Sequence, residues 1–277
     1  MDVLHQISTV RKTVGSLKGP IGLVPTMGSL HQGHLALIKQ ARRDNASVVC
    51  TIFVNPTQFG SGEDYSLYPR DTEKDLSLLD SEQVDLVFCP SPEEMYPEGF
   101  DSWVNVGALT SRLEGESRPD HFRGVCTIVL KLLNIFQPDR AYFGQKDAQQ
   151  AMVIERMTRD LNIGTEIVRV PIVRESDGLA LSSRNTLLTI EERKAALILS
   201  HSLELAVKMY NNGQRHAEDI KQEIGSLIAN EPLAIKDYIS VADPVTLDEI
   251  ENADAPVLIA LAVRIGKIRL IDNVIIP

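Results

Sequence analysis

The 277-residue sequence is poor in cysteine and in aromatic residues. It holds three cysteines without C-x-x-C spacing, and only 5% of its residues are aromatic. Cys50, Cys89 and Cys126 lie within apolar runs, so we interpret them as reduced core thiols and not as a disulfide framework. Because disulfides persist mainly in oxidising compartments, this cysteine usage predicts a cytoplasmic protein.

Long apolar runs and an excess of positive charge are also missing. The longest apolar stretch, Ala255 to Val263, is far shorter than the roughly 18 residues that span a membrane. Residues 1–15 lack the apolar centre of a signal peptide. Lys and Arg number 28 against 38 Asp and Glu, a net charge of −10. An acidic chain with little aromatic surface predicts neither a nucleic-acid nor a membrane partner.

The chain is long enough for one large or two ordinary domains. From Ile21 to Ile172, short β-branched runs alternate with helical patterns, which predicts a mostly parallel, Rossmann-like sheet with helices on both faces. An opening helix precedes it, with Ile7, Val10, Val14 and Leu17 on one stripe. The expected strands are Ile21–Val24, Val48–Val54, Val84–Cys89, Ala141–Phe143 and Glu166–Val170.

The pattern changes after Pro171 and predicts a smaller α+β domain, so we divide the chain into residues 1–173 and 174–277. A hairpin turn is expected at Ile265-Gly266. The expected helices and strands of this domain are Ile190–Asn211, His216–Asn230, Tyr238–Val241, Pro256–Val263 and Lys267–Ile271.

The most informative segment is PTMGSLHQGH, in which a predicted strand gives way to a helix carrying His31 and His34 near its start. If that helix begins near Gly33, its N–H groups and positive dipole end favour a phosphate, and two imidazoles add donors. The alternative is that one histidine caps the helix and the other is solvated. Gly28 and Gly33 either let a ligand approach the backbone or serve only the turn.

Two further segments carry polar groups near the same predicted sheet. FVNPTQF follows the second strand and contains Asn55 and Gln58, amides that can donate to a carboxylate or hydroxyl. RPDHFRG places Arg118, His121 and Arg123 before a long helix, where a basic cluster could face a cleft. The alternatives are an ordinary polar loop and a solvated helix start.

FGQKDAQQ follows another predicted strand. Lys146 can neutralise phosphate charge, Asp147 can bind Mg²⁺ directly or through water, and Gln150 lies about one turn further on. Lys146 and Asp147 could equally form a surface pair, and Asp147 could be a helix cap.

DGLALSSRN opens the second predicted domain. Its hydroxyls, Ser182 and Ser183, precede Arg184, whose guanidinium suits bidentate phosphate contacts, although this is also a normal polar turn. Three of the four main polar segments lie at carboxyl ends of strands and one comes from the second domain. Together they predict one ligand-binding crevice.

Six motifs, in this order and spacing, resemble the pantothenate synthetase (pantoate–β-alanine ligase) family: PTMGSLHQGH, FVNPTQF, YPR, RPDHFRGV, FGQKDAQQ and DGLALSSRN. The resemblance covers residues 21–190, and H-x-G-H alone marks the wider nucleotidyltransferase superfamily. It implies an AMP-forming ligase of coenzyme A biosynthesis, in which (R)-pantoate attacks the α-phosphate of ATP and releases pyrophosphate. β-Alanine then displaces AMP from pantoyl adenylate to give pantothenate. The resemblance also implies Mg²⁺ and a homodimer formed through the first domain.

The resemblance further implies roles for individual residues. It makes His34 the proton donor and His31 its phosphate-binding companion, with Lys146 and Arg184 as further catalytic groups. Pantoate would be held by Gln58, which also lies near β-alanine, and by Gln150, and we add Asn55 and Arg118 as substrate-binding candidates. The implied ATP-binding residues are Met27, Gly28, Ser29, Leu30, His31, Gln32, Gly33, His34, Gly144, Gln145, Lys146, Asp147, Val173 through its backbone, Leu181, Ser182, Ser183 and Arg184.

This sequence departs from the family pattern at two of these positions. Family members commonly have Met where this chain has Leu181, and often Glu where it has Gln145. Both changes are mild, because Leu and Met have similar volumes.

Two other functions remain compatible with the residues alone. H-x-G-H permits a nucleotidyltransferase that leaves the nucleotide on its product, and a non-catalytic ATP-binding protein could keep the same fold. Free AMP as a product separates the ligase from the transferase, and loss of turnover on replacing His34 separates an enzyme from a binding protein.

Overall fold

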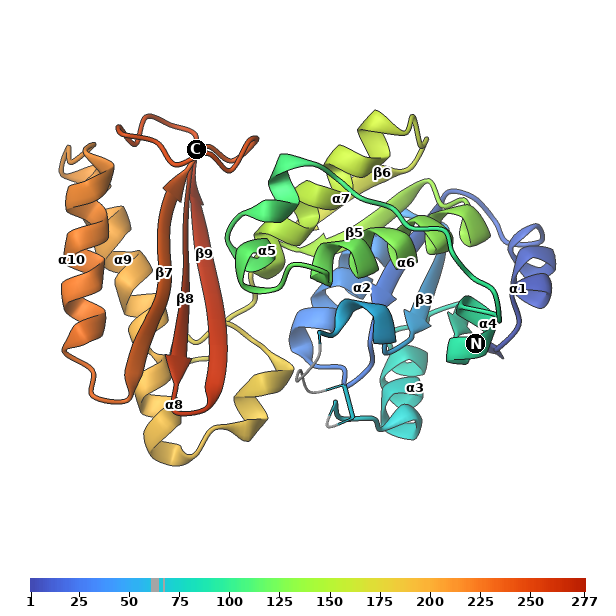
Figure 1. Ribbon diagram of the computed structural model, residues 1–277. Helices are drawn as coiled ribbons and strands as arrows, with labels where there is room; N and C mark the ends of the chain where they lie inside the picture. Colours follow the sequence, from blue (N-terminus) through green and yellow to red (C-terminus); the bar gives the residue numbers. More distant parts are fainter. Residues whose placement is uncertain (61–64, 67) are drawn as a thin grey trace. The chain divides into compact units, whose positions relative to one another are not determined.

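The computed structural model describes residues 1–60, 65–66 and 68–277. The chain forms two units, drawn in Figure 1. The first contains Met1–Gln145 and Gln149–Pro171, and the second contains Lys146–Ala148 and Ile172–Pro277. Along the chain the units therefore divide after Pro171, whereas the sequence prediction divides it after Val173.

The first unit is built on a six-stranded sheet in the order β1-β4-β3-β2-β5-β6, in which every pairing is parallel. The expected parallel, Rossmann-like architecture is thereby confirmed. The strands are β1 (Asp2–Leu4), β2 (Ile21–Thr26), β3 (Ser47–Ile52), β4 (Leu86–Phe88), β5 (Arg140–Gly144) and β6 (Glu166–Val170).

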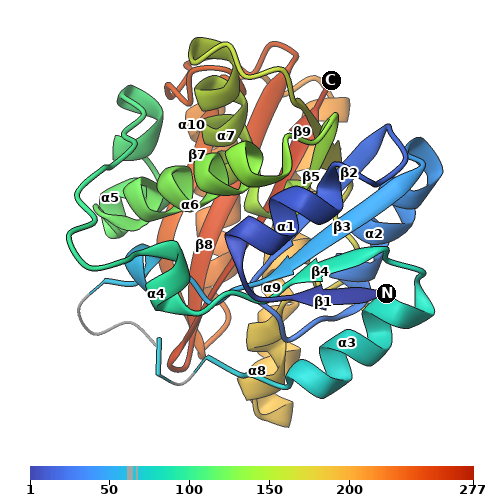
Figure 2. The same cartoon turned by 90° about the vertical axis from the view of Figure 1, so that its right-hand side faces the viewer.

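Helices cover both faces of this sheet, as Figure 2 shows, with α1 and α6 on one side and α2 and α3 on the other. Burial on both faces explains why β2 and β3 are almost continuously apolar. The longer helices are α1 (Ile7–Val14), α2 (Gln32–Asp44), α3 (Thr72–Ser81), α6 (His121–Phe136) and α7 (Ala148–Asp160). The short ones are η1 (Pro56–Gln58), α4 (Pro92–Met95), η2 (Ala108–Ser111), α5 (Glu114–Ser117) and η3 (Gln145–Asp147).

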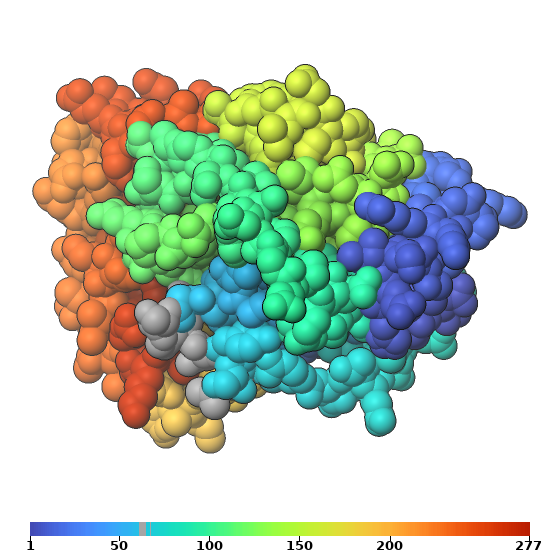
Figure 3. All heavy atoms as spheres, turned by 45° about the vertical axis from the view of Figure 1, so that its right-hand side comes forward, coloured from blue at the N-terminus to red at the C-terminus, as the bar shows by residue number. Residues whose placement is uncertain are grey.

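A long connection from β4 to α6 runs over the surface of this unit, in green in Figure 3.

The three cysteines all belong to the first unit. Cys50 and Cys126 are buried, and Cys89 is partly exposed. Burial raises the pKa of Cys89 to about 11 and that of Cys126 to about 12. Their protonated, unpaired state agrees with the interpretation as core thiols.

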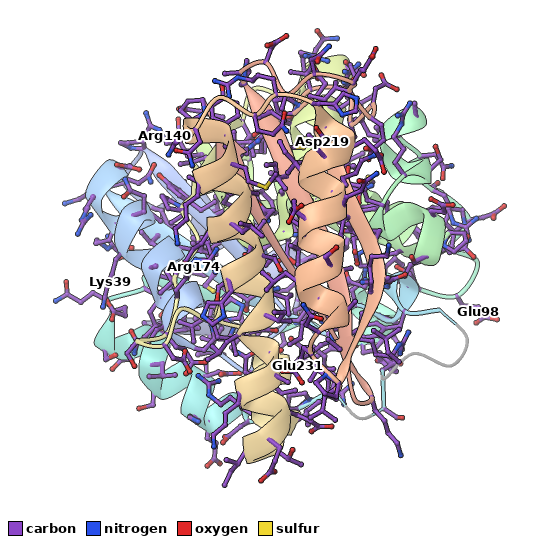
Figure 4. All side chains as sticks on the ribbon, turned by 90° about the vertical axis from the view of Figure 1, so that its left-hand side faces the viewer. Lys39, Glu98, Arg140, Arg174, Asp219 and Glu231 are labelled. Carbon is purple, nitrogen blue, oxygen red and sulfur yellow. The ribbon has the colours of Figure 1, made fainter. Side chains whose placement is uncertain are left out.

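The second unit is a three-stranded antiparallel sheet, β7-β8-β9, against which two helices pack. Figure 4 shows α9 and α10 side by side across the sheet. Alternate residues of β8, from Val257 to Ile265, share a buried core with Leu199 and Ile220. This confirms the expected α+β class. The elements are η4 (Ser183–Leu187), α8 (Ile190–Ala196), α9 (Ile198–Asn211), α10 (Ala217–Ala229), β7 (Ala234–Ala242), β8 (Val257–Ile265) and β9 (Ile268–Ile276).

Several boundaries differ from the sequence prediction. The expected helix over Ile190–Asn211 is two helices, with a break at Leu197. The hairpin turn lies one residue later than expected, because Ile265 still pairs with Ile268 and the turn begins at Gly266 with a φ of 55°. This left-handed conformation suits glycine, which explains the position of the turn.

Candidate active site

Three of the sequence-predicted segments leave the same edge of the parallel sheet. Residues 27–34 follow β2, residues 53–58 follow β3, and residues 145–150 follow β5. Because β2 lies between β3 and β5, the carboxyl ends of these strands are neighbours. After β2, the next two strands along the chain, β3 and β4, are added on one side of β2, and β5 and β6 are added on its other side. The β2–β5 boundary is therefore a topological switch point, where open α/β sheets bind ligands.

His31 and His34 form a reciprocal cap at the start of α2. His31 Nδ1 accepts a hydrogen bond from the Gly33 N–H at 3.1 Å, and His34 Nδ1 accepts one from the His31 N–H at 3.3 Å. The two ring centroids lie 4.1 Å apart. Since each Nδ1 is an acceptor, each neutral imidazole carries its proton on Nε2. Both histidines thus contribute to the cap, unlike the alternative of one cap and one solvated ring.

The turn between β2 and α2 has an unusual backbone that a buried carboxylate supports. Gly28 and Ser29 adopt left-handed conformations, with φ values of 80° and 53°. Asp75, on α3 and 2% exposed, accepts hydrogen bonds from the N–H groups of Ser29 (2.8 Å) and Leu30 (2.7 Å). A Cβ at position 28 would lie 2.8 Å from Asp75 Oδ2. Gly28 is therefore required by the turn itself.

Asn55 organises the segment that follows β3. Its Nδ2 donates to Gln58 Oε1 and to the Gly124 carbonyl, both at 3.2 Å, and its Oδ1 accepts from the Tyr96 hydroxyl at 2.8 Å. Burial raises the pKa of Tyr96, so this hydroxyl stays protonated as a donor. Asn55 is 1% exposed. Its amide is occupied by protein partners, which favours a role in positioning Gln58.

Gln58 joins three segments of the first unit. Its Nε2 donates to Met27 Sδ at 2.9 Å. Its backbone carbonyl accepts from His121 Nδ1 at 2.9 Å and from Arg118 at 3.3 Å. The structure thus brings Met27, Asn55, Gln58 and Arg118 together, and their binding of ATP or pantoate stays a prediction. Arg118 and His121 also contact each other at 3.3 Å.

The residues after β5 divide between the two units. Gly144, Gln145 and Gln150 lie in the first unit, and Lys146 and Asp147 in the second. Lys146 Nζ lies 3.7 Å from Asp147 Oδ1, so the pair expected as one alternative is present.

A contact within the second unit also fixes the backbone at Lys146. Its carbonyl accepts from Asn273 Nδ2, on β9, at 2.9 Å. The side chain of Lys146 is 19% exposed, and that of Asp147 is 50% exposed.

The segment 173–185 forms a turn closed by its own hydrogen bonds. The Leu181 N–H donates to the Val173 carbonyl at 3.0 Å, which makes these two expected ATP-binding residues neighbours. Ser182 caps η4, because its Oγ accepts from the Arg184 N–H at 3.3 Å. Ser183 opens η4. The serines and Arg184 therefore share one turn of the second unit, and their approach to the residues of the first unit stays a prediction.

A network of hydrogen bonds and ion pairs, centred on Glu175 and Arg193, connects this turn to α8. Asn185 Nδ2 donates to Glu175 Oε1 at 3.1 Å and to the Ala180 carbonyl at 3.0 Å. Both oxygens of Glu175 accept from Arg193, at 3.1 and 2.9 Å. Arg193 also donates to Asp177 at 2.8 Å.

Neither a metal cluster nor a membrane-spanning helix is found in the part of the chain that the structure describes. Within it, no three His, Cys, Asp or Glu side chains are grouped so that they could hold a metal ion. Across the same residues, no helix combines the length and apolar character needed to cross a bilayer.

Comparison with known proteins identifies the family. The model of the family described as Pantoate-beta-alanine ligase matches residues 2–275. The chain belongs to this family. A relative named pantothenate synthetase from Chloroflexus aurantiacus is 54% identical over 99% of this chain and 97% of its own length. Another, from Thermotoga petrophila, is 50% identical over all of this chain and 99% of its own.

Solved structures of pantoate–β-alanine ligases have the same fold. Pantothenate synthetase from Thermus thermophilus superposes with a TM-score of 0.95 at 46% identity, covering 99% of both chains. The Francisella tularensis enzyme, solved in complex with beta-gamma ATP and β-alanine, has a TM-score of 0.81 at 37% identity, covering 99% of this chain and 97% of its own.

Sequence reasoning missed three polar residues of this candidate site, of which Asp75 and Gln149 are buried and Tyr96 is partly buried. Asp75 and Tyr96 hold residues of the motifs, as described above. Gln149 donates from Nε2 to the carbonyls of Leu109 and Arg112, each at 2.7 Å, directly before Gln150. The quoted motifs gave a partial signal, since Gln149 lies within FGQKDAQQ and Asp75 shortly follows YPR.

Proposed function

We propose that this chain is an AMP-forming ligase that joins (R)-pantoate to β-alanine at the expense of ATP, producing pantothenate for coenzyme A biosynthesis. The observation that carries this proposal is the His31–His34 pair at the start of α2, beside the switch point of a ligase-family sheet. The relative from Francisella tularensis, solved in complex with beta-gamma ATP and β-alanine, supports ATP and β-alanine as two of the three substrates.

In the first step, a pantoate carboxylate oxygen attacks the α-phosphorus of ATP, and the bond to the bridging oxygen of pyrophosphate breaks. Negative charge moves toward the β-phosphate as this bond lengthens. Donors at His31 Nε2 and His34 Nε2, together with the cations Lys146 and Arg184, would stabilise that charge more in the transition state than in the ground state. His34 acts as the proton donor in this scheme.

Pantoate is assigned to Gln58 and Gln150. Neutral amides can orient a carboxylate by hydrogen bonds without neutralising it in an ion pair, so its oxygen remains nucleophilic. Gln58 is well suited to this task because Asn55 and Met27 already fix the orientation of its amide. Arg118 contacts the backbone of Gln58, which supports a place for it beside the same substrate.

In the second step, the β-alanine amine attacks the acyl carbon of pantoyl adenylate. The carbon–oxygen bond to AMP breaks, the amine loses a proton, and pantothenate and AMP leave. Water would hydrolyse the same adenylate, so the site must exclude it. We assign that task to the second unit as a lid, with Ser182, Ser183 and Arg184 binding the phosphates.

Mg²⁺ and the remaining ATP contacts complete the proposal. Mg²⁺ is usually bound through one or two carboxylates and substrate phosphates, so the half-exposed carboxylate of Asp147 fits it. When bound, the ion would neutralise phosphate charge. The other ATP-binding residues are those that the family resemblance implies in residues 27–34 and 144–147, at Val173 and in residues 181–184. A homodimer and a cytoplasmic location belong to the same proposal.

Isotope exchange tests the adenylate mechanism. With ATP, Mg²⁺ and pantoate but no β-alanine, the protein should exchange labelled pyrophosphate into ATP, because the first step is reversible. Adding β-alanine should then release AMP in equal amount to pantothenate. Pantothenate formation without exchange would contradict the adenylate intermediate, and a nucleotide retained on the product would favour a nucleotidyltransferase.

A further inference from the structure

We propose that Asp75 is a positioning residue of the nucleotide site, which sets the backbone of Ser29 and Leu30 and through it the placement of His31 and His34. The inference rests on the proposed function, since it concerns the segment assigned to ATP. The feature behind it is a carboxylate that is 2% exposed and aimed at two backbone N–H groups.

The carboxylate is held on a rigid element. Asp75 lies in the first half of α3, whose N-cap residue Asp71 accepts from the Lys74 N–H at 3.1 Å. The Asp75 N–H itself donates to the Asp71 carbonyl at 3.0 Å. One turn further along, Leu79 is fully buried in the core beside the sheet. The position of the Asp75 carboxylate is therefore fixed by α3, whereas the turn at Ser29 and Leu30 that it contacts has an irregular backbone.

The two contacts use one oxygen each. Asp75 Oδ2 accepts from Ser29 at 2.8 Å, and Oδ1 accepts from Leu30 at 2.7 Å. A buried carboxylate is costly unless charge-assisted hydrogen bonds compensate its lost hydration. These two N–H groups are well placed to do so, and their geometry is set in return.

The backbone conformation of the turn explains why it needs support. Gly28 and Ser29 have positive φ values, and the consecutive N–H groups of Ser29 and Leu30 point at one carboxylate, as in the anion-binding concavities that turns form. Ser29 would not favour this conformation by itself. In this protein the anion in the concavity is the protein's own Asp75. An ATP phosphate is thereby directed past the turn, toward the start of α2 and the two histidines.

The link from Asp75 to the histidines is short. Leu30 is joined to His31 by one peptide bond, and His31 is both the N-cap of α2 and the donor to His34 Nδ1. If Ser29 leaves the left-handed region, the His31 N–H moves and the reciprocal cap loosens. The first consequence should be a less defined orientation of both imidazoles.

Asp75→Asn tests this link with little change of volume. Asparagine can accept one of the two N–H groups, but its own Nδ2 then faces the other donor. Asp85→Asn is the matched control. Asp85 Oδ2 also accepts a hydrogen bond from a backbone N–H group, that of Val48, at 2.7 Å. Asp85 directly precedes β4 and therefore lies at the amino edge of the same sheet, opposite the edge that carries the candidate site.

We expect Asp75→Asn to raise the KM for ATP about tenfold or more, with the KM for pantoate changed less than twofold. Asp85→Asn should leave both KM values unchanged, even if it lowers the melting temperature. A purely structural role for Asp75 predicts no such split between the substrates. Wild-type values of the KM for ATP in folded Asp75→Asn would overturn the proposal, as would equal changes for both substrates. If Asp75→Asn does not fold, Asp75→Glu keeps the charge, displaces the carboxylate by one methylene, and is judged by the same values.

A second readout does not depend on activity. Nitrogen-15 NMR of the imidazoles should show both His31 and His34 as the Nε2–H form in the wild type and in Asp85→Asn, and mixed forms in Asp75→Asn. Unchanged imidazole signals in Asp75→Asn would contradict the proposal. If the wild type shows no pyrophosphate exchange, the proposed function fails, and the imidazole spectra still decide whether Asp75 orients the histidines.

Discussion

At the scale of single residues, each histidine of the H-x-G-H motif uses its two ring nitrogens differently. The Nδ1 atoms of His31 and His34 accept backbone N–H groups of the helix start. The same bonds keep the proton on Nε2, the atom to which we assign the ligand. The structure confirms the capping interpretation of the motif, and the functional interpretation stays a prediction that is compatible with it, because capping the helix orients the rings.

The two tasks of His34 can be separated by mutation. His34→Gln should keep the cap, because glutamine at this position reaches back to the N-cap N–H in a capping box, but it removes the imidazole. We expect the melting temperature to stay near the wild-type value and pyrophosphate exchange to fall about a hundredfold or more, as for the loss of an oxyanion donor.

His34→Ala, which loses both the cap and the imidazole, is the comparison. It should lower stability by about 1 kcal/mol in addition to the loss of exchange. Exchange by His34→Gln at the wild-type rate would show that the imidazole is needed only as a cap.

For single residues, the sequence reveals a candidate feature when the residues that form it lie close together in the chain. Two histidines after a strand and before a helix are visible in the sequence. Asp75 and Tyr96 are not, because they contact their partners across 46 and 41 residues. Only the packing of α3 and of the long connection onto the sheet brings them there. A carboxylate in a helical pattern otherwise predicts a solvated face.

At the scale of elements, the strands that carry the site were predictable because burial on both faces makes them continuously apolar. β1 was not, since three residues carry too little pattern and its pairing with β4 is a tertiary event. The break at Leu197 was missed for a similar reason. The apolar pattern continues across it, so the sequence predicts one helix.

The conformation of the turn formed by residues 173–185 should depend on the hydrogen bonds and ion pairs of Glu175 with Asn185 and Arg193. Glu175→Gln removes the carboxylate that holds both Asn185 and Arg193, so the turn carrying Arg184 should lose definition. We expect the KM for ATP to rise severalfold, while stability changes by less than about 1 kcal/mol, as is usual for partly exposed ion pairs. Steady-state kinetics with ATP varied would measure this.

Asp237→Asn is the control for this change. Its carboxylate pairs with Arg269 at 2.6 Å between β7 and β9 of the same unit, and neither residue belongs to the segment 173–185. The KM for ATP should be unaffected. Equal effects of the two substitutions would contradict a specific role for Glu175.

At the scale of the whole molecule, a net charge of −10 is compatible with binding ATP. Charges farther apart than about 8 Å are largely screened at physiological salt. Under the proposed function, groups close to the phosphates would therefore decide their binding, and those assigned here are the start of α2, the two histidines, Lys146 and Arg184. The acidic total bears instead on solubility and on the expected absence of a nucleic-acid partner.

The central claim for the whole molecule is that pantoate is activated as an acyl adenylate, and oxygen transfer tests it most directly. Pantoate labelled with oxygen-18 in its carboxylate should pass one labelled oxygen to AMP during synthesis with β-alanine, because that oxygen bridges the adenylate and leaves with AMP. Mass spectrometry of the recovered AMP would show one label per molecule. Unlabelled AMP, or label found in inorganic phosphate or pyrophosphate, would contradict the account.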